Sequence, residues 1–215
     1  MPAPNEKPFS KLMISYTKKK GLLILILCLG PTFVRAQEDE LKIPDEVKLF
    51  VEKDMKAIAL ETADLNGDGT KDYILVTDKA GVKPEDEYTD ESERPMLILV
   101  RGADGKLILA ARNDLIARCK NCGGAYGDPF DGVEARRNGF IVSNTMGSRE
   151  RSNESFQFNY SRRDKTWQLV RAVQSDYDTF KPKSLKTKIL TPPRNFGKIN
   201  FAGFDPDNFV KQGTK

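Results

Sequence analysis

The chain has 215 residues, with 35 lysines and arginines against 31 aspartates and glutamates, and it contains no histidine. The missing histidine excludes histidine-based triads and acid–base relays. The net charge of +4 belongs to the N-terminus, because the first 36 residues hold six of the basic side chains and one of the acidic ones. The remainder has 29 basic and 30 acidic side chains, which removes the global electrostatic argument for a nucleic-acid partner.

The first 36 residues have the pattern of a secretory signal peptide. Lys18–Lys20 precede the apolar stretch Gly21–Gly30, which is too short to span a bilayer. Cleavage after Ala36 would leave Gln37 as the first residue, and Met13 is an alternative start nearer the basic segment. The sequence predicts a periplasmic or secreted protein without a stable membrane span after processing, with an uncleaved anchor as the alternative.

Residues 37–180 are expected to form one globular domain with an α+β fold. Asp45 and Glu46 begin a predicted amphipathic helix over 45–55, since acidic residues are favoured in a first helical turn. Apolar residues then recur at helical spacing: Val47, Phe50, Val51, Met55 and Ile58. The rest of the domain is expected to be a mainly antiparallel, hairpin-rich β-sheet.

Residues 64–72 form the most specific motif of the chain. Calcium takes six to eight oxygen ligands at about 2.3–2.6 Å, so a short loop must turn sharply to aim several of them at one point. The predicted ligands are the side chains of Asp64, Asn66 and Asp68, the Thr70 carbonyl, and Asp72 directly or through water. The alternative is an Asp/Gly-rich turn between two strands that binds nothing.

The loop resembles the calcium loops of FG-GAP and VCBS repeats, the integrin-type propeller modules with the pattern D-x-[DN]-x-D-G-x-x-D. The matching positions are Asp64, Asn66, Asp68, Gly69 and Asp72. The resemblance implies Ca²⁺ as the ligand and a strand directly after the loop. A full propeller is not expected, because the motif occurs once and propellers need repeated blades.

Further hairpins are predicted from short turn signals. Asp104-Gly105 and Asn138-Gly139 tolerate positive φ and favour tight turns. The predicted strand pairs are 96–100 with 107–110, 133–136 with 140–143, and 156–160 with 167–173. The aromatic residues of one strand share a face and predict a core, with a carbohydrate-stacking platform as the alternative: Phe156, Phe158 and Tyr160.

Two segments carry charge of one sign. Residues 79–94 form a predicted acidic, solvated surface loop, with a second cation-attracting surface as the alternative. Residues 181–215 form a predicted basic C-terminal tail, which Pro182, Pro192 and Pro193 keep extended. The tail is expected to be solvated, or to dock on an acidic surface.

Cys119 and Cys122 are the two cysteines expected after signal removal. Without histidine they cannot complete an ordinary four-ligand zinc site. In an oxidising compartment they form either a short structural disulfide or a redox-active dithiol. Gly123-Gly124 directly afterwards argues against the helix that usually follows a redox C-x-x-C motif. We therefore predict a structural disulfide, with a thiol–disulfide oxidoreductase as the alternative.

Several segments resemble a group of uncharacterised exported bacterial proteins. They are Arg94-Pro95, Leu97–Leu99, Ala111–Asp114, Cys119–Gly124, Gly127–Phe130 and Trp167–Val170. The resemblance implies a bacterial envelope or secreted setting and a compact mixed fold, without an established activity. It also offers a candidate surface feature, whose alternative is a simple turn before the next strand: Cys119, Cys122, Asp128 and Phe130.

The sequence therefore predicts an exported calcium-binding envelope or secreted protein that acts as a binding or structural module rather than as an enzyme. No catalytic residue and no organic cofactor are predicted. The expected partners are a calcium ion and an envelope protein or glycan, and the alternative functions are a thiol–disulfide oxidoreductase and a carbohydrate-binding module.

Overall fold

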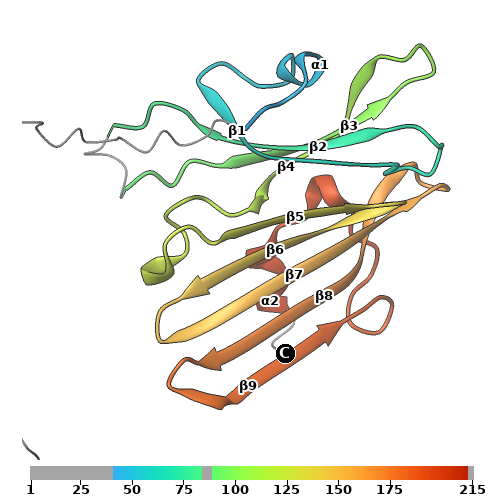
Figure 1. Cartoon of the computed structure of the whole chain (residues 1–215). Helices are drawn as coiled ribbons and strands as arrows, with labels where there is room; N and C mark the ends of the chain where they lie inside the picture. Colours follow the sequence, from blue (N-terminus) through green and yellow to red (C-terminus); the bar gives the residue numbers. More distant parts are fainter. Residues whose placement is uncertain (1–40, 84–88, 213–215) are drawn as a thin grey trace, which may run out of the picture. The chain divides into compact units, whose positions relative to one another are not determined.

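The computed structural model describes residues 41–83 and 89–212 (Figure 1). The predicted signal peptide and the centre of the predicted acidic loop lie outside these ranges. All described elements belong to one compact unit, Glu40–Lys215. Within the described ranges, no helix has both the length and the apolar character needed to cross a membrane.

Nine strands in the described residues form two antiparallel sheets, and each strand pairs with its neighbour in sequence. The first sheet contains β1 (Met55–Ala63), β2 (Asp72–Lys79), β3 (Arg94–Arg101) and β4 (Leu107–Ala117). The second sheet contains β5 (Phe130–Arg136), β6 (Gly139–Gly147), β7 (Glu150–Ser161), β8 (Thr166–Asp178) and β9 (Lys181–Leu190).

The predicted α+β class is wrong, because the protein is nearly all β, with 53% strand and 9% helix. The predicted helix 45–55 is a single turn, α1 (Asp45–Lys48). Asp54 adopts a left-handed conformation with φ 63°, which a continuing helix does not permit, and Met55 already begins β1. The apolar residues nevertheless share one environment, since Val47 is buried with Phe50 and Val51 packed beside it against the first sheet.

The four predicted hairpins are confirmed. β1 pairs with β2, β3 with β4, β5 with β6, and β7 with β8. Gly105 and Asn138 have φ of 78° and 62°, so the two turn signals occupy the conformations that Gly and Asn tolerate best. Local turn chemistry therefore sets the strand register at these two turns.

The predicted C-terminal tail is wrong for residues 181–212. Residues 181–190 form β9, which pairs with β8 at the edge of the second sheet, where a proline such as Pro182 can be accommodated. Phe201, Phe204 and Phe209 follow in the 3₁₀ turn η2 (Phe201–Gly203) and the helix α2 (Pro206–Gln212), and all three are buried. The C-terminal segment is therefore part of the core.

The main core lies between the two sheets and the C-terminal segment. Ile74 and Ile98 of the first sheet face Phe140 and Phe158 of the second, and the Phe201 ring packs edge-on against both phenyl rings. Phe156 and Phe158 are 2% and 0% exposed. The carbohydrate platform proposed for this strand is therefore wrong for these two rings, and the aromatic stripe is core.

The role of the C-terminal segment can be tested with one substitution at two positions. Phe201→Ala should lower the free energy of unfolding by about 3–5 kcal/mol, because it opens a cavity under the first sheet. Phe180→Ala, at an exposed turn just before the segment, should stay within about 0.5 kcal/mol of the wild type. Urea unfolding followed by circular dichroism measures both, and equal values would contradict the packing described.

Candidate functional site

The predicted calcium loop connects β1 to β2 and is held by its own polar side chains. Asp64 Oδ1 accepts a hydrogen bond from Gly67 N at 2.7 Å, and Asp64 Oδ2 accepts one from Gly69 N at 3.2 Å. Asn66 Oδ1 accepts from Asp68 N at 2.9 Å. Both glycines have positive φ, 76° and 91°, as the tight turn requires. The side-chain oxygens are thus tied to the backbone of the same loop.

The second half of the loop continues this pattern. Asp68 Oδ1 accepts a hydrogen bond from Thr70 N at 2.7 Å, and Asp68 Oδ2 accepts one from the Asn66 amide at 2.8 Å. The hydrogen bonds from Thr70 and Asn66 hold the pKa of Asp68 below its ordinary value. Asp68 therefore stays ionised over the whole neutral range.

Asp72 differs from the other predicted ligands because it is fully buried. Its Oδ2 accepts a hydrogen bond from Leu65 N and its Oδ1 one from Arg101 N, each at 3.0 Å. Burial raises the pKa of Asp72, the two N–H donors oppose the shift, and the charges of Asp68 and Asp64 add to it. Asp72 thus joins the end of β1 to β3.

The described residues contain no group of three or more Asp, Glu, Cys or His side chains arranged to hold a metal ion. The structure keeps Asp64, Asn66, Asp68 and Thr70 together on one loop and directs both oxygens of Asp72 to backbone donors. Calcium at this loop stays a prediction.

The loop also connects the two sheets. Leu65 is fully buried in the main core, and its carbonyl accepts a hydrogen bond from Trp167 Nε1 at 2.9 Å. The Asp64 carbonyl accepts one from Asn138 N, also at 2.9 Å. Arg137 Nε lies 3.6 Å from Asp64 Oδ2. The position of the loop therefore fixes how β1 meets the second sheet.

Cys119 and Cys122 form a disulfide, with Cys119 buried. The bridge is followed by the 3₁₀ turn η1 (Gly124–Tyr126) rather than by an α-helix. A Cβ on Gly123 would lie 2.1 Å from the Gly127 carbonyl oxygen, so only glycine fits there. These features favour a structural bridge over a redox-active pair, whose reactive cysteine usually opens a helix.

Arg94 at the start of β3 is a buried cation that the sequence did not single out. It is 1% exposed, and its guanidinium donates to Asp78 of β2 at 2.8 Å and to both carboxylate oxygens of Asp128 at 2.6 and 2.7 Å. Burial lowers the pKa of Arg94, but the hydrogen bonds and charges of Asp128 and Asp78 outweigh it and raise the pKa. The arginine remains charged.

The residues of the candidate surface feature lie in separate structural environments. Asp128 pairs with the buried Arg94, whereas Phe130 packs against the main core. Cys119 and Cys122 shape the neighbouring loop. The only sequence signal for this arrangement was indirect, since Arg94 and Asp128 both lie in segments that resemble exported bacterial proteins.

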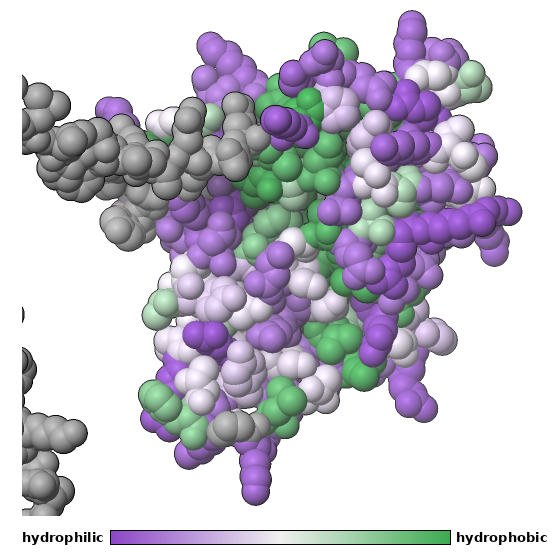
Figure 2. Space-filling model, in the orientation of Figure 1, coloured by the Kyte–Doolittle hydropathy of each residue, from purple (hydrophilic) through white to green (hydrophobic). Residues whose placement is uncertain are grey.

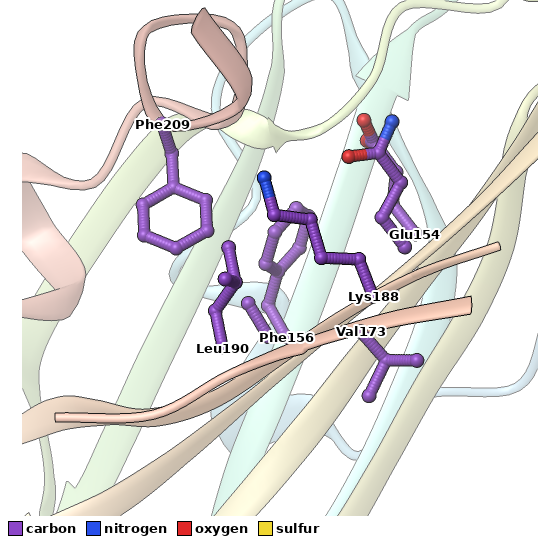
Figure 3. A pocket seen from close by; sticks show the side chains of 8 residues that line it. Glu154, Phe156, Val173, Lys188, Leu190 and Phe209 are labelled. Atoms are coloured by element: carbon purple, nitrogen blue, oxygen red, sulfur yellow. The ribbon is translucent and has the colours of Figure 1, made fainter. Parts of the chain in front are cut away.

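A second, largely buried arginine ties the C-terminal helix to the sheets. Arg118, just after β4, donates to Glu154 of β7 at 3.0 Å and to Asp207 of α2 at 2.7 Å. Glu154 also lines a small pocket together with Phe209 of α2 and Leu190 of β9 (Figure 3). Burial raises the pKa of Glu154 above its ordinary value, although the charge and hydrogen bonds of Arg118 oppose the shift.

No protein-family model and no curated protein matches the sequence. Among solved structures, the chain is similar to a Xanthomonas type IV secretion system related protein, with 12% sequence identity and a TM-score of 0.35. The match covers 67% of this chain and 58% of that chain, so the aligned region spans little more than half of the other protein. A likeness this weak carries no argument about fold or function, and the resemblance to FG-GAP and VCBS loops stays a prediction.

The raised pKa of Glu154 predicts a pH dependence of stability. A carboxyl whose folded pKa lies above the unfolded value of about 4.3 keeps its proton longer in the folded state. The folded protein should therefore lose stability relative to Glu154→Gln as the pH rises from the unfolded pKa through the folded one. Urea unfolding of both proteins at a series of pH values measures the difference, and an opposite slope would contradict the assignment.

Proposed function

We propose that this protein is an exported, all-β calcium-binding module in which one Ca²⁺ stabilises the loop between β1 and β2. The observation that carries the proposal is the hydrogen bonding of Asp64, Asn66 and Asp68, whose side-chain oxygens are held by N–H groups of their own loop. A carboxylate or amide oxygen has two lone pairs, so an oxygen that accepts one hydrogen bond keeps a second position for a cation. Both oxygens of Asp64, Asn66 Oδ1 and Asp68 Oδ2 are of this kind, whereas Asp68 Oδ1 accepts from both the N–H and the hydroxyl of Thr70.

The proposed ligands are two carboxylates, one amide oxygen and one carbonyl: Asp64, Asp68, Asn66 and Thr70. Water would complete the six to eight oxygens that calcium takes. Asp72 would act through its nearby negative charge, since it is fully buried and both of its oxygens face backbone N–H groups, those of Leu65 and Arg101. A set with two ligating carboxylates fits a weak site, with a dissociation constant of about 10⁻⁴–10⁻³ M as in extracellular modules.

The ion would serve the fold rather than a reaction. Three carboxylates are close enough for Asp64 and Asp68 to raise the pKa of Asp72, and a bound cation would offset that repulsion. The same loop holds Leu65 beneath Trp167 of β8. Calcium binding would therefore stabilise the contact between the two sheets.

Export is supported by two independent features. The first 36 residues have the order of a signal peptide, a basic segment followed by an apolar stretch and a cleavage site. The Cys119–Cys122 disulfide fits an oxidising compartment such as the bacterial periplasm or the medium.

Calcium should raise the free energy of unfolding of the processed chain that begins at Gln37. At a calcium concentration about ten times the dissociation constant, mass action predicts about 1.4 kcal/mol of stabilisation. Asp68→Ala should abolish this response, because it removes a ligand and the cap on Thr70 N. Urea unfolding in calcium and in chelator measures the effect for each protein.

Asp104→Ala is the matched control. Asp104 caps Lys106 N in the β3–β4 turn, as Asp68 caps Thr70 N, but it lies outside the calcium loop. This variant should keep the full calcium response. A wild-type protein that shows no heat of binding at millimolar calcium in isothermal titration, or an Asp68→Ala variant that responds like the control, would reject the proposal.

A further inference from the structure

Three loops meet at one end of the second sheet, on the side away from the calcium loop (Figure 1). They are η1, the β6–β7 turn at 148–149 and the β8–β9 turn at 179–180. Thr179 N donates to the Arg149 carbonyl and Gly147 N to the Gly123 carbonyl, each at 2.9 Å. The hydrogen bonds hold the three loops together as one surface.

This surface, which we call the basic tip, exposes large apolar side chains. Phe180 is 78% exposed, Leu185 57% and Tyr126 36%. In the orientation of Figure 1, apolar residues lie among hydrophilic ones at the lower left of the space-filling view (Figure 2). A single exposed apolar side chain would need no explanation, but three of them on one set of turns indicate an interaction surface.

Cations surround these side chains. The Arg149 guanidinium lies 5.3 Å from the centre of the Phe180 ring, and that of Arg151 lies 4.8 Å from the centre of the Tyr126 ring. The basic members of the tip are Arg149, Arg151, Lys181, Lys183 and Lys186. No ion pair within 4.0 Å joins any of the three lysines to a carboxylate in the part of the chain that the structure describes, although, after the Arg149 hydrogen bond, the charge of Lys181 contributes to the lowered pKa of Asp178.

Acidic side chains at the tip are fewer and partly neutralised. Asp178 forms an ion pair with Arg149 at 2.8 Å, and the other two carboxylates are Glu150 and Asp176. From residue 179 to residue 204 the chain contains no acid. On the η1 side, the Asp90 carbonyl accepts a hydrogen bond from Asn121, so the acidic loop borders that side. The positive charge is therefore concentrated along β9.

We propose that the basic tip docks on an anionic phospholipid bilayer. Phe180 and Leu185 would enter the boundary between headgroups and acyl chains, and the lysines and arginines would remain at the level of the phosphates. The charge of the tip requires an anionic surface, whereas the exposed phenyl and leucyl groups require an apolar one. A bilayer that contains anionic lipid supplies both, and a soluble polyanion supplies only the first.

The turn is already fixed in the shape that such docking needs. Phe180 N donates to Asp178 Oδ1 at 2.9 Å, and Asp178 N donates to Ser184 Oγ at 2.7 Å. The tip therefore presents Phe180 on an ordered backbone, which lowers the ordering cost of binding. Docking does not depend on the calcium loop, which lies at the opposite turns of the sheet.

Vesicle co-sedimentation of the processed chain from Gln37 tests the proposal. Binding to vesicles of phosphatidylglycerol and phosphatidylcholine should exceed binding to phosphatidylcholine alone and should fall with added salt. Phe180→Ser should weaken binding by about tenfold or more, since it removes the buried ring. Lys181→Gln with Lys183→Gln should weaken it by about fivefold for each lysine.

Matched substitutions on the first-sheet side serve as controls. Leu49→Ser removes an exposed apolar residue next to α1, and Lys53→Gln with Lys56→Gln removes two exposed lysines. These variants should bind vesicles like the wild type, and thermal unfolding should show all variants folded. In Phe180→Trp, the added tryptophan should shift its emission to the blue with anionic vesicles.

Several results would overturn the proposal. If Phe180→Ser and the control variants change vesicle binding equally, the tip is not the binding surface. Equal binding to both vesicle types would remove the role of charge. Binding to heparin or polyglutamate without binding to anionic vesicles would show a site for soluble polyanions instead.

Discussion

The structure depends on one buried charge, the Arg94 guanidinium, at the junction of its two sheets. Arg94 is fully buried, and its partners come from β2 (Asp78), from the chain after β4 (the Arg118 carbonyl) and from the segment before β5 (Asp128). Removing one partner from a buried ion pair costs about 3–5 kcal/mol, because it leaves an uncompensated charge. The position where the chain leaves the first sheet and enters the second is therefore fixed by electrostatics as well as by packing.

This junction and the buried aromatic core hold the two sheets together, so the residues of the turns can differ without loss of the fold. An antiparallel meander places the β5–β6 and β7–β8 turns at one end of the second sheet and the β6–β7 and β8–β9 turns at the other. The first end receives the loop 64–72 through the Asn138 and Trp167 hydrogen bonds. The second end receives the loop stiffened by the disulfide, through the Gly123 carbonyl. Each proposed binding surface is thus a set of turns that the same framework positions.

Local signals in the sequence predicted local structure well. Asp104-Gly105 and Asn138-Gly139 located hairpins because the φ values of a tight turn are a property of the turn residues themselves. The predicted helix failed because helical spacing at Val47, Phe50 and Val51 shows only that these side chains share a neighbour, which here is a sheet. The C-terminal segment differs from the predicted tail because its lysines and prolines are typical of a solvated extended chain, whereas Phe201, Phe204 and Phe209 are buried in the core. The pairing of Arg94 with Asp128, 34 residues apart, had no local signal at all. The oxygen-rich pattern of residues 64–72 located the loop, but only the fold shows that Asp72 bonds to the backbone of β3.

The charge of the molecule also depends on where the charged residues lie, and not only on how many there are. Without the first 36 residues the chain is almost neutral, which argues against a strongly charged partner only if the charges are evenly spread. They are not, since the strand β9 and the residues up to 204 carry lysines and arginines without an acid, whereas Asp90, Glu91 and Glu93 lie on the loop that borders η1. With a screening length of about 8 Å at physiological salt, each of these regions acts on a surface according to its own sign. An anionic bilayer would attract the β9 side and repel the acidic loop. The molecule would therefore dock tilted onto β9, and the neighbouring opposite charges would set its orientation.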